Sequence, residues 1–335
     1  MGLQSSGAIS LDDLHVEVGG TSGTTCSLND SDIRALISVG DSAGQSIQQY
    51  YGQSSETSLP TGGSTVNGQV QLKQISASSY ISSGGTLRIP SNMWVWTDST
   101  STAALTIDIA CTVINDGKVI GQGGEGGYYA ASGRTAGGPA INVTASGVSI
   151  INSSGAYIAG GGGGGANSQD GGDANDKNAG GGGGAGGGAG GRGQVNYGSA
   201  GTAGTLNASG GGSYHLQTGS LLVANGGGAG GGGGGAYWTK RGGGGGGRIL
   251  PGVGGDSGLS GGYGNGGSGG SAGGTYRGPG YGSQSTVAGG GGGWGASGGN
   301  GAGPTGGYGV GAAGGAAITG TSRTLSNSGT IYGST

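Results

Sequence analysis

The first forty residues carry apolar positions at helical spacing. Ser10 and Ser27 each precede a carboxylate by three residues, a pattern typical of a helix N-terminus. The apolar stripes that follow are Leu11, Leu14 and Val18 in the first segment and Ile33, Leu36 and Ile37 in the second. Because neither helix is long enough to be stable alone, we expect each to lie against a partner surface. Residues 41–64 are rich in Ser, Gln and Gly, so residues 1–64 are predicted to form an attachment segment and linker.

Between Val66 and Ile120 the pattern changes to that of β-strands. Residues 105–109 alternate cleanly between apolar and polar side chains, and Gly84-Gly85 and Pro90-Ser91-Asn92 read as turns. Because this stretch is able to build an ordinary apolar core, we predict a small β-domain at residues 65–120.

A short module recurs in degraded form from Ile109 onward. It consists of a β-branched run, an Asn or Ser turn with Gly, an apolar pair and then, in most copies, a glycine track. Because Asn-Asp-Gly and Ser-Gly turns between apolar pairs are hairpin signals, we expect short hairpins between the tracks. The copies are Thr112–Ile120, Ser149–Ile158, the truncated Ser220–Asn225 and Thr324–Tyr332.

Glycine dominates the rest of the chain. Of the 100 glycines in 335 residues, 14 precede residue 121 and 86 follow. Collagen is excluded because glycine does not keep every third position and Pro numbers only 6. A track is either a flexible linker or an extended three-residue helix, and packing in a bundle would satisfy its backbone. Tracks of similar length alternate with aromatic and charged inserts, which favours the bundle. The predicted fold class is therefore mostly β and irregular: short N-terminal helices, a small β-domain, and a bundle of polyglycine II helices with short hairpins at residues 121–335.

The inserts between tracks carry most of the large side chains of this half. Aromatic and Arg side chains on Gly and Ser loops are typical of recognition surfaces, although some aromatic rings could instead cap the bundle. Successive tracks reverse at alternate ends, so only about half of the inserts could face a receptor. The candidate receptor-binding residues are Tyr128, Tyr129, Trp238, Lys240, Arg241, Tyr276, Arg277, Tyr281, Trp294 and Tyr308.

These features resemble a known family. Glycine tracks separated by aromatic inserts are similar to the polyglycine-sandwich adhesins at the tips of the long tail fibres of T-even-like phages, over roughly residues 121–335. The run VINDGKVIGQGGEGG resembles C-terminal modules of other tail-fibre proteins, and SLDDLHVEVGG resembles the openings of phage tail proteins. The resemblance implies a virion protein of the phage tail, made in the host cytoplasm. It implies binding to a bacterial outer-membrane protein or surface glycan, and to other tail or fibre proteins through the N-terminal region.

The remaining chemistry gives little support to other functions. A net charge of −3 with scattered Lys and Arg disfavours nucleic-acid binding, and no apolar stretch is long enough to span a membrane. Asp170, Asp173 and Asp176 fit turn chemistry as well as calcium, and too few Cys and His remain for zinc, so we expect no metal and no cofactor. Because His15 and His215 are the only histidines and no triad can be placed around them, we expect no enzymatic activity.

The sequence is compatible with alternatives in three respects. A glycine-rich ice-binding protein or an extracellular structural protein is the alternative function. Tail fibres are commonly trimeric, whereas a glycine sandwich can close within one chain, so a homotrimer is one of two oligomeric outcomes. Cys26 and Cys111 read as small buried residues more readily than as a disulfide.

Overall fold

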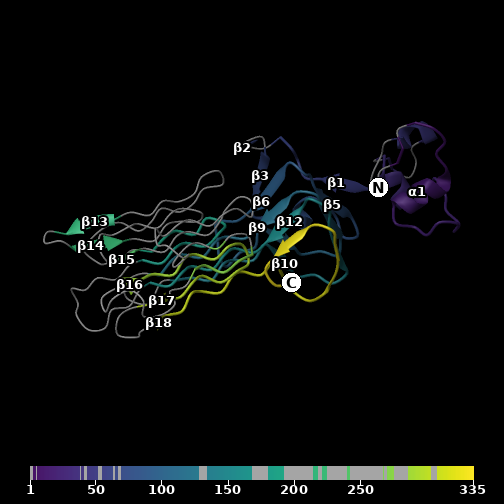
Figure 1. Cartoon of the computed structure of the whole chain (residues 1–335). Helices are drawn as coiled ribbons and strands as arrows, with labels where there is room; N and C mark the ends of the chain where they lie inside the picture. The colour runs from purple at the N-terminus through teal and green to yellow at the C-terminus, as the bar shows by residue number, and fades with distance from the viewer. Residues whose placement is uncertain are drawn as a thin grey trace.

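The computed structural model describes residues 3–4, 6–37, 39–40, 44–51, 55–62, 65–66, 69–127, 134–167, 180–191, 214–217, 221–224, 240–241, 267, 270–274, 286–302 and 308–335. Three regions follow one another along the molecule in Figure 1. A small helical unit lies at one end, a block of parallel strands occupies the middle, and glycine tracks project from that block toward the other end (Figure 1). The chain returns to the strand block at its C-terminus.

The N-terminal unit has its own apolar cluster. Helix α1 (Leu11–Glu17) begins at Ser10 with a capping box in which the Ser10 hydroxyl accepts from the Asp13 amide, which confirms the predicted start. Helix α2 (Ser31–Ala35) begins after Asp30 rather than after Ser27. The two helices and the 3-10 helix η1 (Ile47–Tyr50) pack on one another through Leu14, Ile33 and Tyr50. The helices therefore stabilise each other.

The middle block consists of three sheets whose strands are almost all parallel. Sheet A runs in the order β1 (Glu56–Ser58), β5 (Thr86–Ile89), β8 (Thr112–Asn115), β11 (Val148–Asn152), β20 (Arg323–Asn327). Sheet B runs β2 (Thr65–Val66), β3 (Gln69–Lys73), β6 (Met93–Trp96), β9 (Lys118–Ile120), β12 (Tyr157–Ala159), β21 (Thr330–Tyr332). Sheet C runs β19 (Ile318–Thr319), β10 (Ile141–Val143), β7 (Leu105–Ile107), β4 (Ile75–Ser76).

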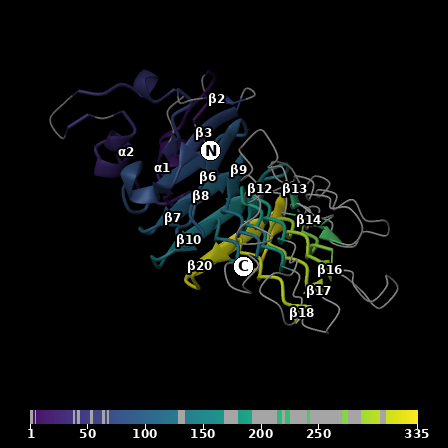
Figure 2. The ribbon, with the colours of Figure 1, turned by 90° about the vertical axis from the view of Figure 1, so that its left-hand side faces the viewer.

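The order of the strands along the chain makes this block a three-sided solenoid. From β3 onward the chain visits sheet B, then C, then A, and each round adds one strand to every sheet. The strands of each sheet lie side by side in Figure 2, with β3, β6, β9 and β12 in sequence. The last round is made by β12, β19 and β20 and is followed by β21, so residues far apart in the sequence complete it.

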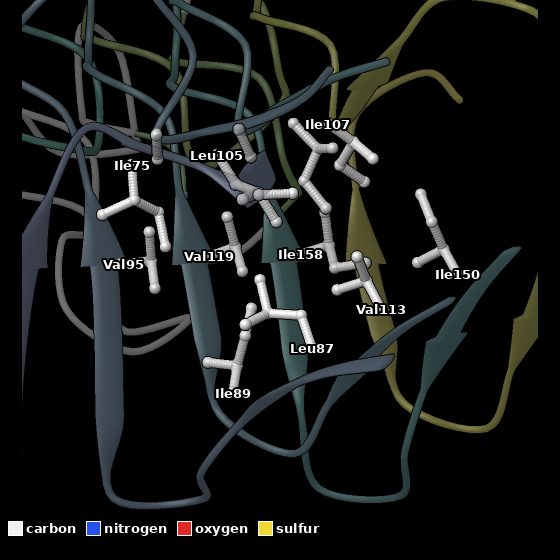
Figure 3. Packing of buried hydrophobic residues seen from close by; sticks show 14 of the residues in the cluster. Ile75, Leu87, Ile89, Val95, Leu105, Ile107, Val113, Val119, Ile150 and Ile158 are labelled. Atoms are coloured by element: carbon white, nitrogen blue, oxygen red, sulfur yellow. The ribbon is translucent and has the colours of Figure 1, made fainter. Parts of the chain in front are cut away.

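Aliphatic side chains from the three sheets fill the solenoid (Figure 3). In sheet B, Val95, Val119 and Ile158 occupy equivalent positions on successive strands, and all three are fully buried. Because successive side chains of a strand point to opposite faces, these residues enter the core while their neighbours in the strand face outward. Leu87, Val113 and Ile150 form the corresponding row of sheet A.

The repeated modules are corners of the solenoid, so the prediction of hairpins at those positions is wrong. In Thr112–Ile120, strand β8 pairs in sheet A and strand β9 pairs in sheet B, and the two do not pair with each other. A Cβ on Gly117 would lie 2.4 Å from the carbonyl oxygen of Pro90 in the preceding round. Glycine is thus required because one corner stacks directly on another. The truncated copy differs, since its strand β14 (Leu221–Ala224) pairs antiparallel with β13 (Tyr214–Gln217).

A ladder of asparagines joins three of these corners. The side-chain amide of Asn115 donates to Asn152 Oδ1 at 2.8 Å, and that of Asn152 donates to Asn327 Oδ1 at 2.7 Å. Asn115 and Asn152 are fully buried. The ladder ties the last round to the rounds before it, although Asn327 is distant from Asn152 in sequence.

Replacing Asn152 with Ala is expected to destabilise the solenoid by roughly 2–4 kcal/mol, because it removes one of the two acceptors of the buried Asn115 amide and opens a small void. Asn327→Ala is the matched control, since Asn327 is exposed and lies at the end of the ladder. Urea unfolding of both variants measures the difference. If the two variants lose the same free energy of unfolding, burial of the hydrogen bond between Asn115 and Asn152 adds nothing to stability, and the prediction is wrong.

Strand β1 lies inside the segment predicted as a linker. It pairs with β5, and the Arg88 guanidinium contacts Glu56 at 2.7 Å and also pairs with Asp116. The hydrogen bond from Arg88 holds the pKa of Glu56 below its usual value. Strands of the three sheets also lie beyond residue 120, so the solenoid includes both flanks of the glycine segment at residues 160–317.

The predicted bundle of polyglycine II helices is wrong as the fold class, although the prediction of a mostly β chain agrees with the structure. The regular architecture is a set of mostly parallel sheets, and the described glycine tracks between strands have no regular secondary structure. The sequence of a glycine track does not distinguish among extended conformations because glycine lacks a Cβ. Cys111 is buried in the solenoid core and Cys26 lies in the N-terminal cluster, and both are free thiols.

Candidate functional site

The glycine-rich residues are inserted at one corner of the solenoid, where the chain passes from sheet B to sheet C. In the first round this corner is Gln74 alone, and in the second it is residues 97–104. In the third round it is residues 121–140, and in the fourth it is residues 160–317. The glycine tracks are therefore corner insertions that project from the same side of the sheets (Figures 1 and 2).

The described tracks pack backbone against backbone. The amide of Gly124 donates to the carbonyl oxygen of Gly162 at 2.8 Å, and the amide of Gly162 donates to that of Ala185 at 2.8 Å. A Cβ on Gly161 would lie 1.8 Å from the carbonyl oxygen of Gln122. Glycine is required where a neighbouring backbone occupies the space of a side chain, so the tracks form a packed layer rather than loose linkers.

Trp294 lies where the tracks meet the sheets. Its side chain is 1% exposed and packs with Ala185, Trp94 and Ile120 on the outer face of sheet B. Its ring centroid lies 6.1 Å from that of Tyr332, with the planes tilted by 59°. A side chain this deeply buried has no surface to offer a receptor, so the structure gives Trp294 a packing position instead. Its place fits the alternative that some aromatic rings cap the glycine layer.

Lys118 occupies the outer face of sheet B near this junction. Its ammonium group lies 4.6 Å from the ring centroid of Trp94 and 5.9 Å from that of Tyr157, which are its neighbours on the adjacent strands. Burial lowers the pKa of the Lys118 ammonium group. These contacts indicate a structural role, because the Lys118 ammonium group near the rings of Trp94 and Tyr157 stabilises the pairing of the adjacent strands.

The far end of the glycine layer carries two small sheets (Figure 1). One is the hairpin of β13 and β14. The other runs in the order β15 (Lys240–Arg241), β16 (Thr286–Val287), β17 (Gly301–Ala302), β18 (Tyr308–Gly309), and β15 lies beside β14. Segments separated by more than sixty residues thus meet at one end of the molecule.

Three of the predicted receptor-binding residues belong to this second sheet. Lys240 and Arg241 form strand β15, and Tyr308 begins strand β18. Strand β17 of this sheet packs closely against the backbone of another glycine track, because a Cβ on Gly301 would lie 2.2 Å from the carbonyl oxygen of Asn167. The structure therefore brings these three residues onto one small sheet that is held by a packed support.

The other candidates lie outside the described residues, namely Tyr128, Tyr129, Trp238, Tyr276, Arg277 and Tyr281. The same holds for Asp170, Asp173 and Asp176. Strand β13, with Tyr214 and His215, lies at this end but was absent from the predicted site. Its signal is local: two short runs of large residues flank Thr218-Gly219-Ser220, which reads as a hairpin turn.

The electrostatic character of the chain differs between its regions. Residues 160–317 contain six Lys and Arg and four Asp, a net charge of +2, whereas residues 1–55 have a net charge of −5. In the part of the chain that the structure describes, no group of three His, Cys, Asp or Glu residues is placed to hold a metal ion. A search of the same residues finds no helix with the length and apolar character to cross a membrane.

Comparison with known proteins gives two matches. A family described as phage tail fibre adhesin Gp38 matches residues 59–237, which is more than half of the chain. The chain is also similar to a structure described as the gp37-gp38 adhesin tip complex of the bacteriophage S16 long tail fibre. That similarity has 19% sequence identity and a TM-score of 0.43, and it covers 98% of this chain and 99% of the other. The comparison with curated proteins found no match.

Proposed function

The chain belongs to the Gp38 family of phage tail fibre adhesins, and from this membership we propose that it binds a bacterial surface receptor through the far end of its glycine layer. The family predicted from the glycine tracks and aromatic inserts is thereby confirmed. The receptor is an outer-membrane protein or a surface glycan. The chain acts by binding, without enzymatic activity and without a cofactor.

One observation carries this proposal. The sheet of β15–β18 gathers Lys240, Arg241 and Tyr308 at the end of the molecule farthest from the helical unit (Figure 1). Aromatic and Arg residues on a rigid support are the usual anchors of protein interfaces. The positive charge of residues 160–317 favours a receptor with anionic groups. We extend the proposed receptor surface to the inserts that carry the remaining candidates, which lie outside the described residues: Tyr128, Tyr129, Trp238, Tyr276, Arg277 and Tyr281.

The opposite end of the chain is proposed to join the virion. The helical unit at residues 1–55 lies away from the glycine layer, which leaves it free to contact another tail or fibre protein (Figure 1). The S16 structure is described as a complex of two fibre proteins, and a corresponding partner is proposed for this chain. The protein would then reside at the phage tail after synthesis in the host cytoplasm.

Alanine substitution at the far end tests the receptor proposal. Lys240→Ala, Arg241→Ala and Tyr308→Ala are each expected to weaken binding of the purified chain to intact Gram-negative host cells by roughly tenfold or more, with unchanged melting temperature. Lys73→Ala is the matched control. Its exposed ion pair with Asp98 lies on the solenoid and contributes about 0–1 kcal/mol.

Cell binding is measured by titrating labelled protein onto cells and by blocking of phage adsorption. If Lys73→Ala weakens binding as much as the three far-end variants do, the receptor contacts the solenoid instead. If none of the three far-end variants changes binding, these strands are not part of the receptor surface.

A further inference from the structure

The outward face of helix α1 carries an exposed apolar side chain, Val16, that lies outside the apolar cluster of the N-terminal unit. Leu11, Leu14 and Val18 point into the cluster of the N-terminal unit, and Leu14 is fully buried. Val16 lies on the other side of the helix and is 47% exposed. An exposed apolar residue on its own is ordinary, but Val16 sits in a hollow.

The hollow has a volume of about 460 Å³ and joins α1 to the segment before it. Leu3, Ile9 and Val16 supply its apolar lining, and Asp12, Asp13 and Glu17 supply carboxylates. Apolar side chains beside several carboxylates are complementary to a peptide segment that carries an apolar side chain next to Lys or Arg.

The carboxylates around this hollow are fixed in place. Asp12 accepts hydrogen bonds from the Gly23 amide at 2.8 Å and from the Ser22 hydroxyl at 2.7 Å, which lower the pKa of the carboxyl group. Asp13 accepts from the hydroxyl and the amide of Ser10, both at 2.7 Å, which lower its pKa as well. Both groups are therefore ionised at neutral pH, and each carboxylate keeps lone pairs for a further donor.

The charge of the whole unit agrees with this local picture. Residues 1–55 contain six Asp and Glu against a single Arg, whereas the other 280 residues have a net charge of +2. Such an imbalance attracts a basic partner and repels a second copy of the same unit. The glycine layer projects from the strand block on the side away from the helical unit (Figure 1).

We propose that this hollow, lined by Leu3, Ile9, Val16, Asp12, Asp13 and Glu17, is the seat of a segment of the tail-fibre partner that carries an apolar anchor beside Lys or Arg. The inference rests on the proposed attachment of the N-terminal unit to the virion. The apolar anchor fills the hollow against Val16, and the basic side chain contacts the carboxylates of α1.

The test uses the full chain and phage particles prepared without it, and measures loading by co-sedimentation. Val16→Ser and the double variant Asp12→Asn/Glu17→Gln are each expected to weaken loading tenfold or more, while cell binding by the free chain is unchanged. Val310→Ser and Asp32→Asn are the matched controls, since Val310 is exposed on the glycine half and Asp32 lies on α2 away from the hollow. Raising the salt concentration is expected to weaken loading of the wild-type chain and to affect the double variant less.

The outcomes distinguish failure of the hollow as a binding site from failure of the proposed attachment of the N-terminal unit to the virion. If the wild-type chain loads and both hollow variants load equally well with unchanged melting temperatures, the hollow is not the seat and the attachment proposal stands. If the wild-type chain does not load at all, the attachment proposal fails together with this one. If the free chain self-associates and Val16→Ser abolishes that association, a second copy occupies the hollow and the proposal is overturned.

Discussion

A chain in which a copy of residues 97–104 replaces residues 160–317 is expected to fold and to lose cell binding by more than a hundredfold. Residues 97–104 make the same passage from sheet B to sheet C in the second round of the solenoid. The two ends of the long insertion already lie together, because a Cβ on Gly160 would lie 2.1 Å from the carbonyl oxygen of Gly315. Closing that corner therefore requires no change in the strands.

The shortened chain is measured by circular dichroism, thermal melting and cell binding. A β-type spectrum and one cooperative melt are expected, since β19, β20 and β21 still complete the last round. The matched control is Ile158→Asp in the shortened chain, which buries a charge in the core and is expected to prevent folding. A shortened chain that is unfolded would show that the solenoid depends on the glycine layer, and retained cell binding would place the receptor surface on the solenoid.

Gly161→Val is expected to destabilise the protein by about 3 kcal/mol or more, with a fall in melting temperature of roughly 5 °C or more. A Cβ at this position would lie 1.8 Å from the carbonyl oxygen and 2.3 Å from the carbonyl carbon of Gln122. Because the obstacle is backbone in the neighbouring track, rotation of a side chain cannot relieve it.

Gly62→Val is the control for this substitution. Gly62 has no atom within 4 Å of the added Cβ and is not among the glycines with positive φ. Differential scanning calorimetry of the two variants is expected to separate them clearly. An unchanged melting temperature for Gly161→Val would mean that the tracks are separated by solvent and that the layer provides no rigid support for the far end.

Local features of the sequence predicted local structure well. The capping box at Ser10 marks the start of α1, and the alternation in Leu105–Ile107 marks strand β7. These signals are carried by residues a few positions apart, so one stretch of sequence contains all the information that is needed.

The solenoid itself could not be predicted in this way. The turn Asn115-Asp116-Gly117 has the composition of a hairpin turn, and only the pairing of β8 and β9 with strands of other rounds shows that it is a corner. The partners of the last round, such as Asn152 and Asn327, are separated by the whole glycine segment. A local pattern therefore identified the repeated module but gave it the wrong geometry.

The candidate site shows the same limit. Trp294 and Tyr308 both follow glycine tracks and looked alike as recognition residues. The structure places Trp294 against the outer face of sheet B and places Tyr308 in the far-end sheet. The chain reverses between them, since β16 pairs antiparallel with β17 and β17 pairs antiparallel with β18. The end to which an insert belongs depends on the number of tracks before it, which the composition of the insert does not reveal.

Hydrogen–deuterium exchange of the full chain, with and without outer-membrane vesicles from a host strain, tests the central claim most directly. Strands β13–β18 and the inserts that connect them are expected to become protected on binding, while the solenoid strands and residues 1–55 exchange as in the free protein. Protection confined to the solenoid or to the N-terminal unit, with unchanged exchange in β13–β18, would contradict the claim that the far end of the glycine layer binds the receptor.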